Sequence, residues 1–315
     1  MSGALLFISE AEVRRLLDLD LLIERLAVAF VELSSGRASV PPRIAARSGA
    51  GLLGVMPGYL DGILESKLVS VFPGNHHHGL PSHQALIALF DAETGSPLAV
   101  MDGTHITAAR TGAASALSTR VLARPDARVL AVLGAGVQGR SHLLAHERSR
   151  VFDEVRIASR RPEHAAELAR ELGATPFESF ATAARGADVV CLCTDATAPV
   201  TERAWFGPGT HVTSVGSSAG GPELDPDTVR AADLLVVEHR DAFGPYPGGA
   251  HELQGLDPAA AAELGEVIAG TRPGRASAEQ LTVYKSMGHA VEDAVAADLV
   301  YRAARAAGAG VELAL

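Results

Sequence analysis

Along the first part of this chain, apolar positions are first spaced as in helices, then alternate with polar positions as in strands, and then return to helical spacing. Ser9 to Glu12 read as a capping box that opens an amphipathic helix, and a second helical pattern follows. Short alternating runs then indicate half-buried strands, before a long alanine-rich helix. The ranges expected after the first helix are a helix over 20–33, strands over 42–46, 51–57, 62–72, 85–91 and 97–101, and a helix over 107–122. This part of the chain is therefore expected to be an α+β domain.

From residue 128 onward, apolar strand-like runs alternate with helical patterns. The expected strands are 129–133, 154–159, 188–194, 211–216 and 233–238. This alternation predicts an α/β fold with a doubly wound parallel sheet of the Rossmann type. Ser286 can cap a last helix, 287–307, that returns to the N-terminal part. We therefore expect a discontinuous substrate and dimerisation domain (1–122 with 288–315) and a central dinucleotide-binding domain (123–287).

A glycine-rich turn joins the first strand of the central domain to its first helix. The strand 129–133 runs into Gly134-Ala135-Gly136-Val137-Gln138-Gly139, a G-x-G-x-x-G sequence. The first glycine allows a tight turn, the second lets the backbone approach a pyrophosphate, and the third permits close helix–strand packing. The helix N-terminus then offers N–H groups to the phosphates. We predict that Gly134, Gly136, Val137, Gln138 and Gly139 bind a dinucleotide.

The end of the second strand bears on the choice of cofactor. An acidic residue usually stands there in NAD-binding proteins and accepts from the ribose 2′-OH. This chain has Ser159-Arg160-Arg161 instead. Guanidinium groups suit a phosphate, so the three residues favour NADP(H) over NAD(H), although an ordinary solvated turn is the alternative.

The composition favours a cytoplasmic enzyme. The 27 basic and 37 acidic residues give a net charge of −10, which argues against nucleic-acid or anionic-membrane partners. The N-terminus lacks the basic region of a signal peptide, and no apolar run approaches the ~20 residues of a membrane span. Cys191 and Cys193 alternate on one strand and are expected to be buried and unbridged.

Three cations stand where charges are costly. Lys67 shares a strand face with Val69 and Val71, and Arg110 lies among small apolar residues, so a buried guanidinium there needs an anion. Arg43 begins a strand. If the three converge they make a clamp for a carboxylate, although Lys67 could instead extend to solvent at a sheet edge. The histidine run 76–78 favours a solvated loop, and we expect no metal site.

Several blocks resemble the ornithine cyclodeaminase/μ-crystallin family, in the same order and across essentially the whole chain. They are 67–75 (KLVSVFPGN), 91–95 (DAETG), 101–103 (MDG), 109–116 (ARTGAASA), 134–138 (GAGVQ) and 285–293 (KSMGHAVED). The resemblance implies a homodimer with a shared β-barrel, an active site between the two domains, and hydride transfer between a nicotinamide and the α-carbon of an amino or imino acid.

The resemblance also assigns roles to individual residues. It implies that Arg43, Lys67 and Arg110 bind the substrate carboxylate and that Met56 lies at the substrate. Further cofactor contacts are expected at family motif positions, namely Thr111, Ser286 and Gly288.

Two departures from the family pattern narrow the activity. Cyclodeaminases carry a general-base Asp where this chain has Ser218, and a Glu where it has Gly54. A Ser hydroxyl cannot take a proton unaided at neutral pH. Ser218 is also a point of resemblance to μ-crystallin, a ketimine reductase that uses NADPH.

The sequence therefore favours an NAD(P)H-dependent reductase of α-imino acids, in particular cyclic ketimines such as Δ1-pyrroline-2-carboxylate. Lys67, Arg110 and Ser218 are the expected catalytic residues. Lys67 would assist the arginines or protonate the imine nitrogen. The alternatives are an L-amino-acid dehydrogenase, then ornithine cyclodeaminase, or a non-catalytic NADPH-dependent binder.

Overall fold

The computed structural model describes residues 4–216, 221–246 and 248–314, which form two compact units. Unit 1 comprises the described residues up to 110 and from 289 onward, and unit 2 comprises those from 111 to 288. The described elements of unit 1 are β1 (Ala4–Ile8), α1 (Glu10–Leu16), α2 (Leu19–Ser34), β2 (Ile44–Arg47), β3 (Leu52–Leu60), β4 (Ile63–Val71), the 3₁₀ helix η1 (Pro73–His78), β5 (His83–Asp91), β6 (Pro97–Asp102), α9 (Ala290–Ala307) and β15 (Val311–Ala314). Helix α3 (Thr104–Leu122) begins in unit 1 and continues into unit 2.

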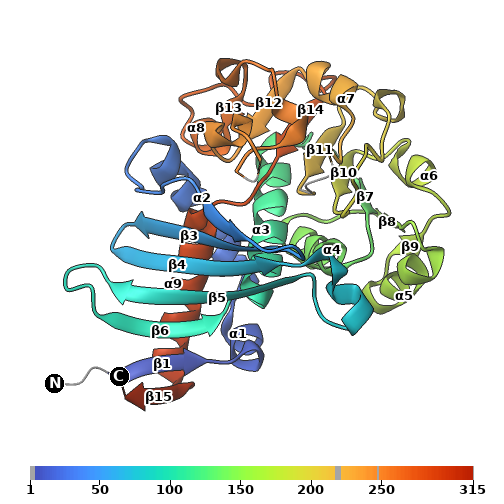
Figure 1. Ribbon diagram of the computed structural model, residues 1–315. Coiled ribbons are helices and arrows are strands. Elements are labelled where there is room, and N and C mark those ends of the chain that lie inside the picture. The colour runs from blue at the N-terminus through green and yellow to red at the C-terminus, as the bar shows by residue number, and fades with distance from the viewer. Residues whose placement is uncertain (1–3, 217–220, 247, 315) are drawn as a thin grey trace. The chain divides into compact units, whose positions relative to one another are not determined.

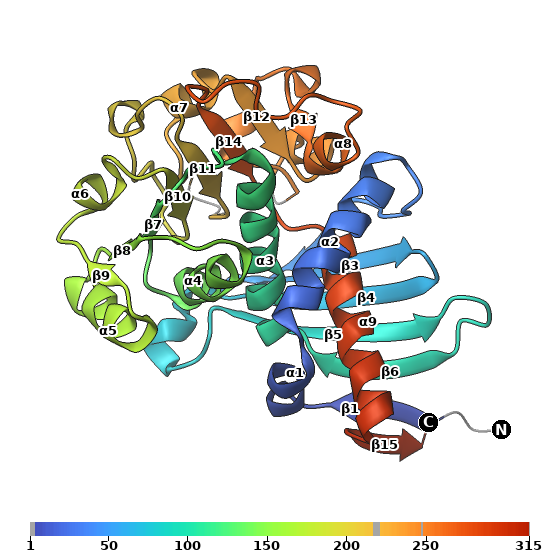
Figure 2. The same ribbon diagram turned by 180° about the vertical axis from the view of Figure 1, so that it is seen from behind.

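Unit 1 is built on one sheet, whose described strands follow the order β15-β1-β6-β5-β4-β3-β2. Strands β2 to β6 pair antiparallel with their neighbours, and β1 joins β6 in parallel. Helix α9 packs across β3, β4 and β5, and α2 packs on α9; Figure 2 shows both helices in front of the sheet. The sheet therefore has one face covered by helices of its own unit.

The register of the strands decides which residues α9 covers. Met56, Lys67, Ile87 and Met101 are successive cross-strand partners on β3, β4, β5 and β6, and all four are buried. Directly opposite residues of antiparallel strands point to the same face. Lys67 therefore lies on the inner, apolar face beneath α9.

The opposite face of this sheet carries exposed apolar side chains. Ile44, Val55, Leu68 and Leu86 form the neighbouring row of cross-strand partners. Ile44 is 68% exposed, Leu68 40% and Leu86 48%. In Figure 1 these strands face the viewer and α9 lies behind them.

Unit 2 contains a parallel sheet whose described strands follow the order β13-β12-β14-β11-β10-β7-β8-β9. Its elements are β7 (Val129–Leu133), α4 (Val137–Ser149), β8 (Glu154–Ala158), α5 (Pro162–Leu172), β9 (Thr175–Pro176), α6 (Phe180–Ala184), β10 (Val189–Leu192), η2 (Arg203–Trp205), β11 (His211–Ser214), α7 (Pro226–Arg230), β12 (Leu234–Val237), η3 (Arg240–Phe243), η4 (His251–Leu253), η5 (Pro258–Ala260), β13 (Ala262–Glu263), α8 (Leu264–Ile268) and β14 (Thr282–Lys285).

Alternation along the strands gives unit 2 an apolar core on each face of the sheet. Leu130 and Val132 pack with Leu143 of α4, whereas Ala131 and Leu133 pack with the opposite cluster. The α/β class with a doubly wound parallel sheet, expected from the sequence, is confirmed. The capping box at Ser9 and Glu12 is also present, and Cys191 and Cys193 are buried and free.

The last helix differs from its sequence prediction. It begins at Ala290 rather than at residue 287, and His289 rather than Ser286 is its N-cap. Gly288 has φ +73°, which a right-handed helix cannot contain. The Ser286 hydroxyl instead donates to Glu238 Oε1 at 2.7 Å. Among the described residues, we find no helix with the length and apolar content that a membrane span requires.

Candidate functional site

The turn between β7 and α4 requires glycine at two positions. Gly134 has φ +120°, and a Cβ there would overlap the carbonyl oxygen of Cys193. A Cβ on Gly139 would overlap the carbonyl oxygen of Gly134. Both overlaps involve backbone atoms, which no side-chain movement relieves. These glycines therefore fix the shape of the turn.

Gly136 serves a different purpose, because a Cβ there would meet nothing within 4 Å. It is exposed and is the N-cap of α4 without a side-chain hydrogen bond. The first turn of α4, with exposed Val137 and half-buried Gln138, thus opens onto free space. Backbone N–H groups at such a helix N-terminus suit phosphate oxygens.

The position of this turn in the sheet also fits a nucleotide. The chain builds the sheet outward from β7 through β8 to β9, and then resumes on the other side of β7 with β10. Ligands of doubly wound sheets bind beyond the carboxyl ends of the strands at such a switch point. The glycine turn follows β7 directly.

Thr111, expected at the cofactor, is buried in α3. Its neighbour Gly112 packs so closely on α4 that a Cβ would overlap the backbone of Ser141. Ser286 and Gly288, also expected there, both donate to Glu238, at 2.7 and 2.6 Å.

Ser159, Arg160 and Arg161 follow the carboxyl end of β8, as the sequence predicts. Both arginines are exposed, and neither guanidinium has an ion pair or hydrogen bond with any described residue. The Arg161 backbone N–H donates to Ser159 Oγ at 3.4 Å, which shapes the turn. The two side chains are thus available to an anionic ligand.

Ser218 lies outside the described residues. The segment before it is held by a carboxylate that the sequence reasoning missed. Glu223 Oε2 accepts from Ser214 Oγ at 2.9 Å and from Gly216 N at 2.8 Å, while its Oε1 accepts from Thr194. Glu223 thereby connects the ends of β10 and β11.

Buried Lys285 supports the same segment. Its Nζ donates to Ser214 Oγ at 3.1 Å and to Gly216 O at 2.7 Å, and lies 3.3 Å from Glu252 Oε1. A buried ammonium requires such partners.

In unit 1, Lys67 and Arg110 meet at Asp293 on α9. Lys67 Nζ lies 3.0 Å from Asp293 Oδ1, and Arg110 Nε lies 3.2 Å from the same oxygen. Arg110 also lies 3.1 Å from Glu292 Oε2. The sequence predicts an anion beside Arg110 but does not identify it, because both carboxylates come from the other end of the chain.

This cluster alters the acidity of its members. Burial lowers the pKa of Lys67 from 10.5 to about 8, with help from the positive charges of Arg110 and Arg43 and against the pull of Asp293. Burial acts to raise the pKa of Asp293, but Lys67 and Arg110 outweigh it and hold that pKa below its ordinary value. Lys67 is therefore a cation with an unusually acidic proton.

The other expected substrate residues lie on the same sheet. Met56 is the cross-strand partner of Lys67 and is buried. Arg43 precedes β2 and is half-buried. The charge of Lys67 also reaches His83, whose pKa is lowered by burial and then by Lys67.

Glu65, two residues before Lys67, is the least expected member of this group. It is 1% exposed, and neither carboxyl oxygen has a hydrogen-bond partner among the described residues. Its position at i−2 from Lys67 places it on the same inner face of β4. Because alternate residues of a strand share a face, the sequence could have predicted that Glu65 lies on the same face as Lys67.

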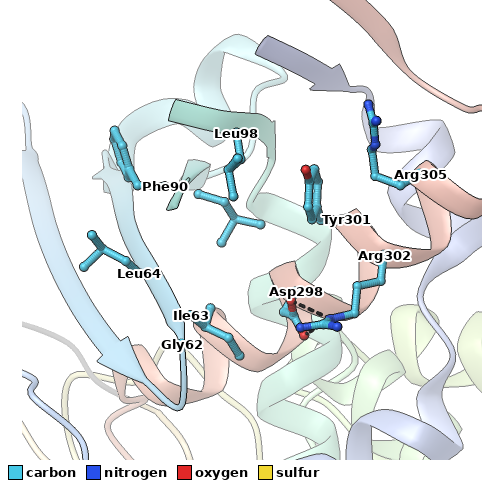
Figure 3. A pocket seen from close by; sticks show the side chains of 10 residues that line it. Gly62, Ile63, Leu64, Phe90, Leu98, Asp298, Tyr301, Arg302 and Arg305 are labelled. Carbon is cyan, nitrogen blue, oxygen red and sulfur yellow. Dashed lines mark hydrogen bonds and ion pairs between the residues drawn. The ribbon is translucent and has the colours of Figure 1, made fainter. Parts of the chain in front are cut away.

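A separate pocket of about 360 Å³ lies elsewhere in unit 1 (Figure 3). The turn between β3 and β4 with the start of β4, the last part of β5, the start of β6 and the C-terminal half of α9 line it. Arg302 spans both oxygens of Asp298, at 2.8 and 2.7 Å. The lining includes none of the predicted site residues.

Unit 2 thus has the features of a dinucleotide-binding domain, and unit 1 carries a buried cluster of cations and carboxylates. A sequence model of the ornithine cyclodeaminase/mu-crystallin family matches residues 5–308, and the chain belongs to this family.

Individual relatives match over almost their whole length. The chain is 41% identical over 312 residues to ketimine reductase mu-crystallin of Mus musculus, covering 96% of this chain and 98% of the relative. It is also similar to the structure of Thermococcus litoralis Delta(1)-pyrroline-2-carboxylate reductase in complex with NADH and L-proline. There the TM-score is 0.92 and the identity 36%, over 98% of this chain and 100% of that one. A dimeric archaeal alanine dehydrogenase with bound NAD gives a TM-score of 0.90 at 30% identity, over 99% of both chains.

Proposed function

We propose that the protein is an NADPH-dependent reductase of cyclic α-imino acids such as Δ1-pyrroline-2-carboxylate. The broader class, a nicotinamide-dependent oxidoreductase that reduces imines, follows from the family and from relatives that include a ketimine reductase and a pyrroline-2-carboxylate reductase. The observation that carries the finer proposal is the acidic, buried Lys67 held by Asp293.

Lys67 is the proton donor in this proposal. The C=N carbon accepts hydride readily once the nitrogen is protonated, so an acid placed at that nitrogen lowers the barrier. A Lys with a pKa of about 8 is protonated at neutral pH and still gives up its proton far more readily than an exposed Lys. Arg43 and Arg110 bind the substrate carboxylate, and Met56 contacts the apolar part of the substrate.

The residues of the glycine turn fit the nucleotide. The open backbone at Gly136 and the N-terminus of α4 would hold the pyrophosphate, with Thr111, Ser286 and Gly288 near the cofactor. When bound, the cofactor supplies the hydride.

Arg160 and Arg161 support a preference for NADPH. A 2′-phosphate would find two unengaged guanidiniums at the end of β8, whereas the ribose hydroxyl of NADH would find no carboxylate in the Ser159–Arg161 turn.

A homodimer is the proposed assembly. The apolar row of Ile44, Leu68 and Leu86 leaves one face of the unit 1 sheet without a cover from its own unit, and such a face is typical of protein–protein contacts. A second copy of this chain would bury it.

The test is oxidation of NADPH in the presence of Δ1-pyrroline-2-carboxylate or Δ1-piperideine-2-carboxylate. NADH, and ornithine or alanine with NAD⁺ or NADP⁺, are run in parallel. Turnover of a ketimine with NADPH preferred is the expected result. Formation of proline and ammonia from ornithine would overturn the proposal, as would oxidation of alanine without ketimine reduction. NADPH binding without turnover would favour a binding protein.

A further inference from the structure

Glu65 is a buried carboxyl group that makes no hydrogen bond within the described part of the chain. Both of its oxygens are shielded from solvent, and neither accepts a hydrogen bond from any described residue. An ionised carboxylate in that position would lose its hydration without compensation, which is unfavourable. A protonated carboxylic acid avoids most of that cost.

The nearest cation is already engaged. Lys67 donates to Asp293 Oδ1 at 3.0 Å, and Arg110 binds Asp293 and Glu292. Lys67 and Arg110 are thus already paired with Asp293 and Glu292, and the half-buried Arg43 is a third positive charge that acts on Lys67. Ionisation of Glu65 would add a further negative charge beside Asp293.

The helix above Glu65 does not supply the missing positive charge. A Cβ on Gly58 would lie 3.2 Å from Glu65 Oε1 and 3.2 Å from Ala290 Cβ, which places the carboxyl beside the first turn of α9. A helix N-terminus favours anions. However, the first turn of α9 already contains Glu292 and Asp293, and Glu292 completes a capping box with His289.

We propose that Glu65 is held as an uncharged carboxylic acid and returns a proton to Lys67 after each turnover. This inference rests on the proposed role of Lys67 as the donor to the imine. Lys67 is 1% exposed, so bulk water has little access to its amine. Glu65 is a positioning residue in this scheme, because it acts through Lys67 and does not touch the substrate.

The proton balance of the step is simple. The Lys67 ammonium gives one proton to the imine nitrogen while hydride reaches the imine carbon, and the C=N bond becomes an amine. Neutral Lys67 then takes the Glu65 proton and becomes an ammonium again; the amine moves toward Glu65 to do so, because the two groups are not hydrogen-bonded in this structure. The Glu65 carboxylate, itself 1% exposed, recovers its proton more slowly, from water that enters as the product leaves. The net reaction consumes one hydride and one proton.

Other charged groups around Lys67 do not fill this role at neutral pH. Burial, then the charge of Asp293, holds the pKa of Glu65 well above its ordinary value, whereas the pKa of Asp293 is lowered. Burial lowers the pKa of His83, so its imidazole is neutral. The described groups that act electrostatically on Lys67, Glu65 or Asp293 include Arg43, His83 and Arg110. Glu292, which pairs with Arg110, and His289 lie beside them at the start of α9.

The first experiment measures protonation and does not depend on the substrate. Full-length wild-type protein and the isosteric Glu65→Gln variant are unfolded with urea between pH 5 and 8. A neutral buried acid ionises on unfolding, so the wild type loses stability relative to the variant as pH rises. The ratio of their unfolding constants should grow about tenfold per pH unit above the ordinary pKa of 4.5. A ratio independent of pH shows an ionised Glu65 and overturns the proposal.

The second experiment measures proton return. Glu65→Gln should leave hydride transfer in the first turnover at the wild-type rate, lower kcat, and change KM little. The Ser66→Ala variant alters the other face of β4 and is the control. An unchanged kcat in Glu65→Gln overturns the proposed return of a proton from Glu65 to Lys67, even if Glu65 is protonated. If the wild type reduces no imino acid, the proposed function fails, and the unfolding experiment still decides the charge of Glu65.

Discussion

Lys67 and Asp293 form an ion pair between β4 and α9, with 3.0 Å between Nζ and Oδ1 and only 2% and 0% of the two side chains exposed. Asp293 also holds Arg110, so one carboxylate orients both cations that the sequence assigns to the substrate. A buried pair contributes little net stability against its desolvation cost. Its presence on the inner face of the sheet therefore favours a chemical role over a purely structural one.

Replacing Lys67 tests that role. Lys67→Met preserves the length of the side chain but removes the acidic proton, while Asp293 keeps Arg110 as a partner. We expect kcat for ketimine reduction to fall by about 10²- to 10⁴-fold, the usual contribution of a general acid. Binding of NADPH, followed by fluorescence titration, should change little.

The pH dependence of the wild type provides a second measure of Lys67. Because its pKa is lowered to about 8, the proton-bearing form is lost above that pH. The value of kcat/KM should therefore be level between pH 6.5 and 7.5 and decline above about 8. A profile that is level up to pH 9.5 would contradict Lys67 as the acid.

The arginines after β8 determine the cofactor preference in our proposal. The double variant Arg160→Ser, Arg161→Ser should raise the KM for NADPH by at least about tenfold, because even a single charge-assisted hydrogen bond to phosphate contributes about 1.5–3 kcal/mol. The KM for NADH should hardly change. Arg170→Ser, at an exposed position on α5, is the matched control. Equal losses with both cofactors would refute a 2′-phosphate site.

Two glycines of the same turn should behave differently. A Cβ on Gly139 would overlap the backbone of Gly134, so Gly139→Ala should lower the melting temperature or prevent folding. Gly136→Ala meets no atom and should fold normally, yet bind NADPH at least tenfold more weakly because the methyl group occupies the space for the pyrophosphate. Calorimetric titration and thermal unfolding separate the two effects. Tight NADPH binding by Gly136→Ala would exclude this turn as the phosphate site.

The parts of the fold that the sequence predicts well depend on local rules. The glycine turn, the capping box at Ser9 and the strand at Cys191 each follow from spacing within a few residues. The pairing of Lys67 with Asp293 spans 226 positions, and no local pattern specifies it. The burial of the Glu65 oxygens, which find no hydrogen-bond partner among the described residues, likewise follows from the packing of α9 over β4.

The start of α9 shows why element boundaries were harder to predict. Ser286 is a suitable N-cap by residue type, but its hydroxyl is taken by Glu238, a residue 48 positions earlier. The short terminal strands β1 and β15 are not predicted from the sequence either, because β15 pairs with β1, and β1 with β15 and β6, from distant parts of the chain. Long-range partners override local preference in both cases.

The exposed apolar row of Ile44, Leu68 and Leu86 on the unit 1 sheet is the dimer interface in our proposal. Leu68→Lys should convert a dimer into a monomer in light scattering at micromolar concentrations, because an ammonium at the centre of an apolar interface is costly to desolvate. Leu144→Lys places the same change on α4 of unit 2 at a similar exposure, 37% against 40%, and should leave the dimer intact. A dimer that persists in Leu68→Lys would place the interface elsewhere.

Three buried histidines of unit 2 predict a steep loss of stability in acid. Burial lowers the pKa of His142 to about 3 and of His146 to about 4, and it lowers the pKa of His211 well below its ordinary value. Each ring is hydrogen-bonded as a neutral imidazole, His142 to Ser115 at 2.9 Å and His146 to Thr119 at 2.9 Å.

The direction in which stability changes with pH follows from the number of protons that the folded and unfolded chains bind. At pH above 6.5 the histidines are neutral both folded and unfolded, so their contribution is fully present. Below 6.5 the unfolded chain binds protons that the folded chain refuses, and stability falls as pH decreases toward 4, by about 1.4 kcal/mol per pH unit for each histidine. Urea unfolding between pH 7.5 and 5 measures this slope. His142→Gln should reduce this slope by the contribution of one histidine, while Ser149→Ala on the same helix should leave the slope unchanged. An unchanged slope in His142→Gln would mean that the His142 ring is already charged in the folded protein.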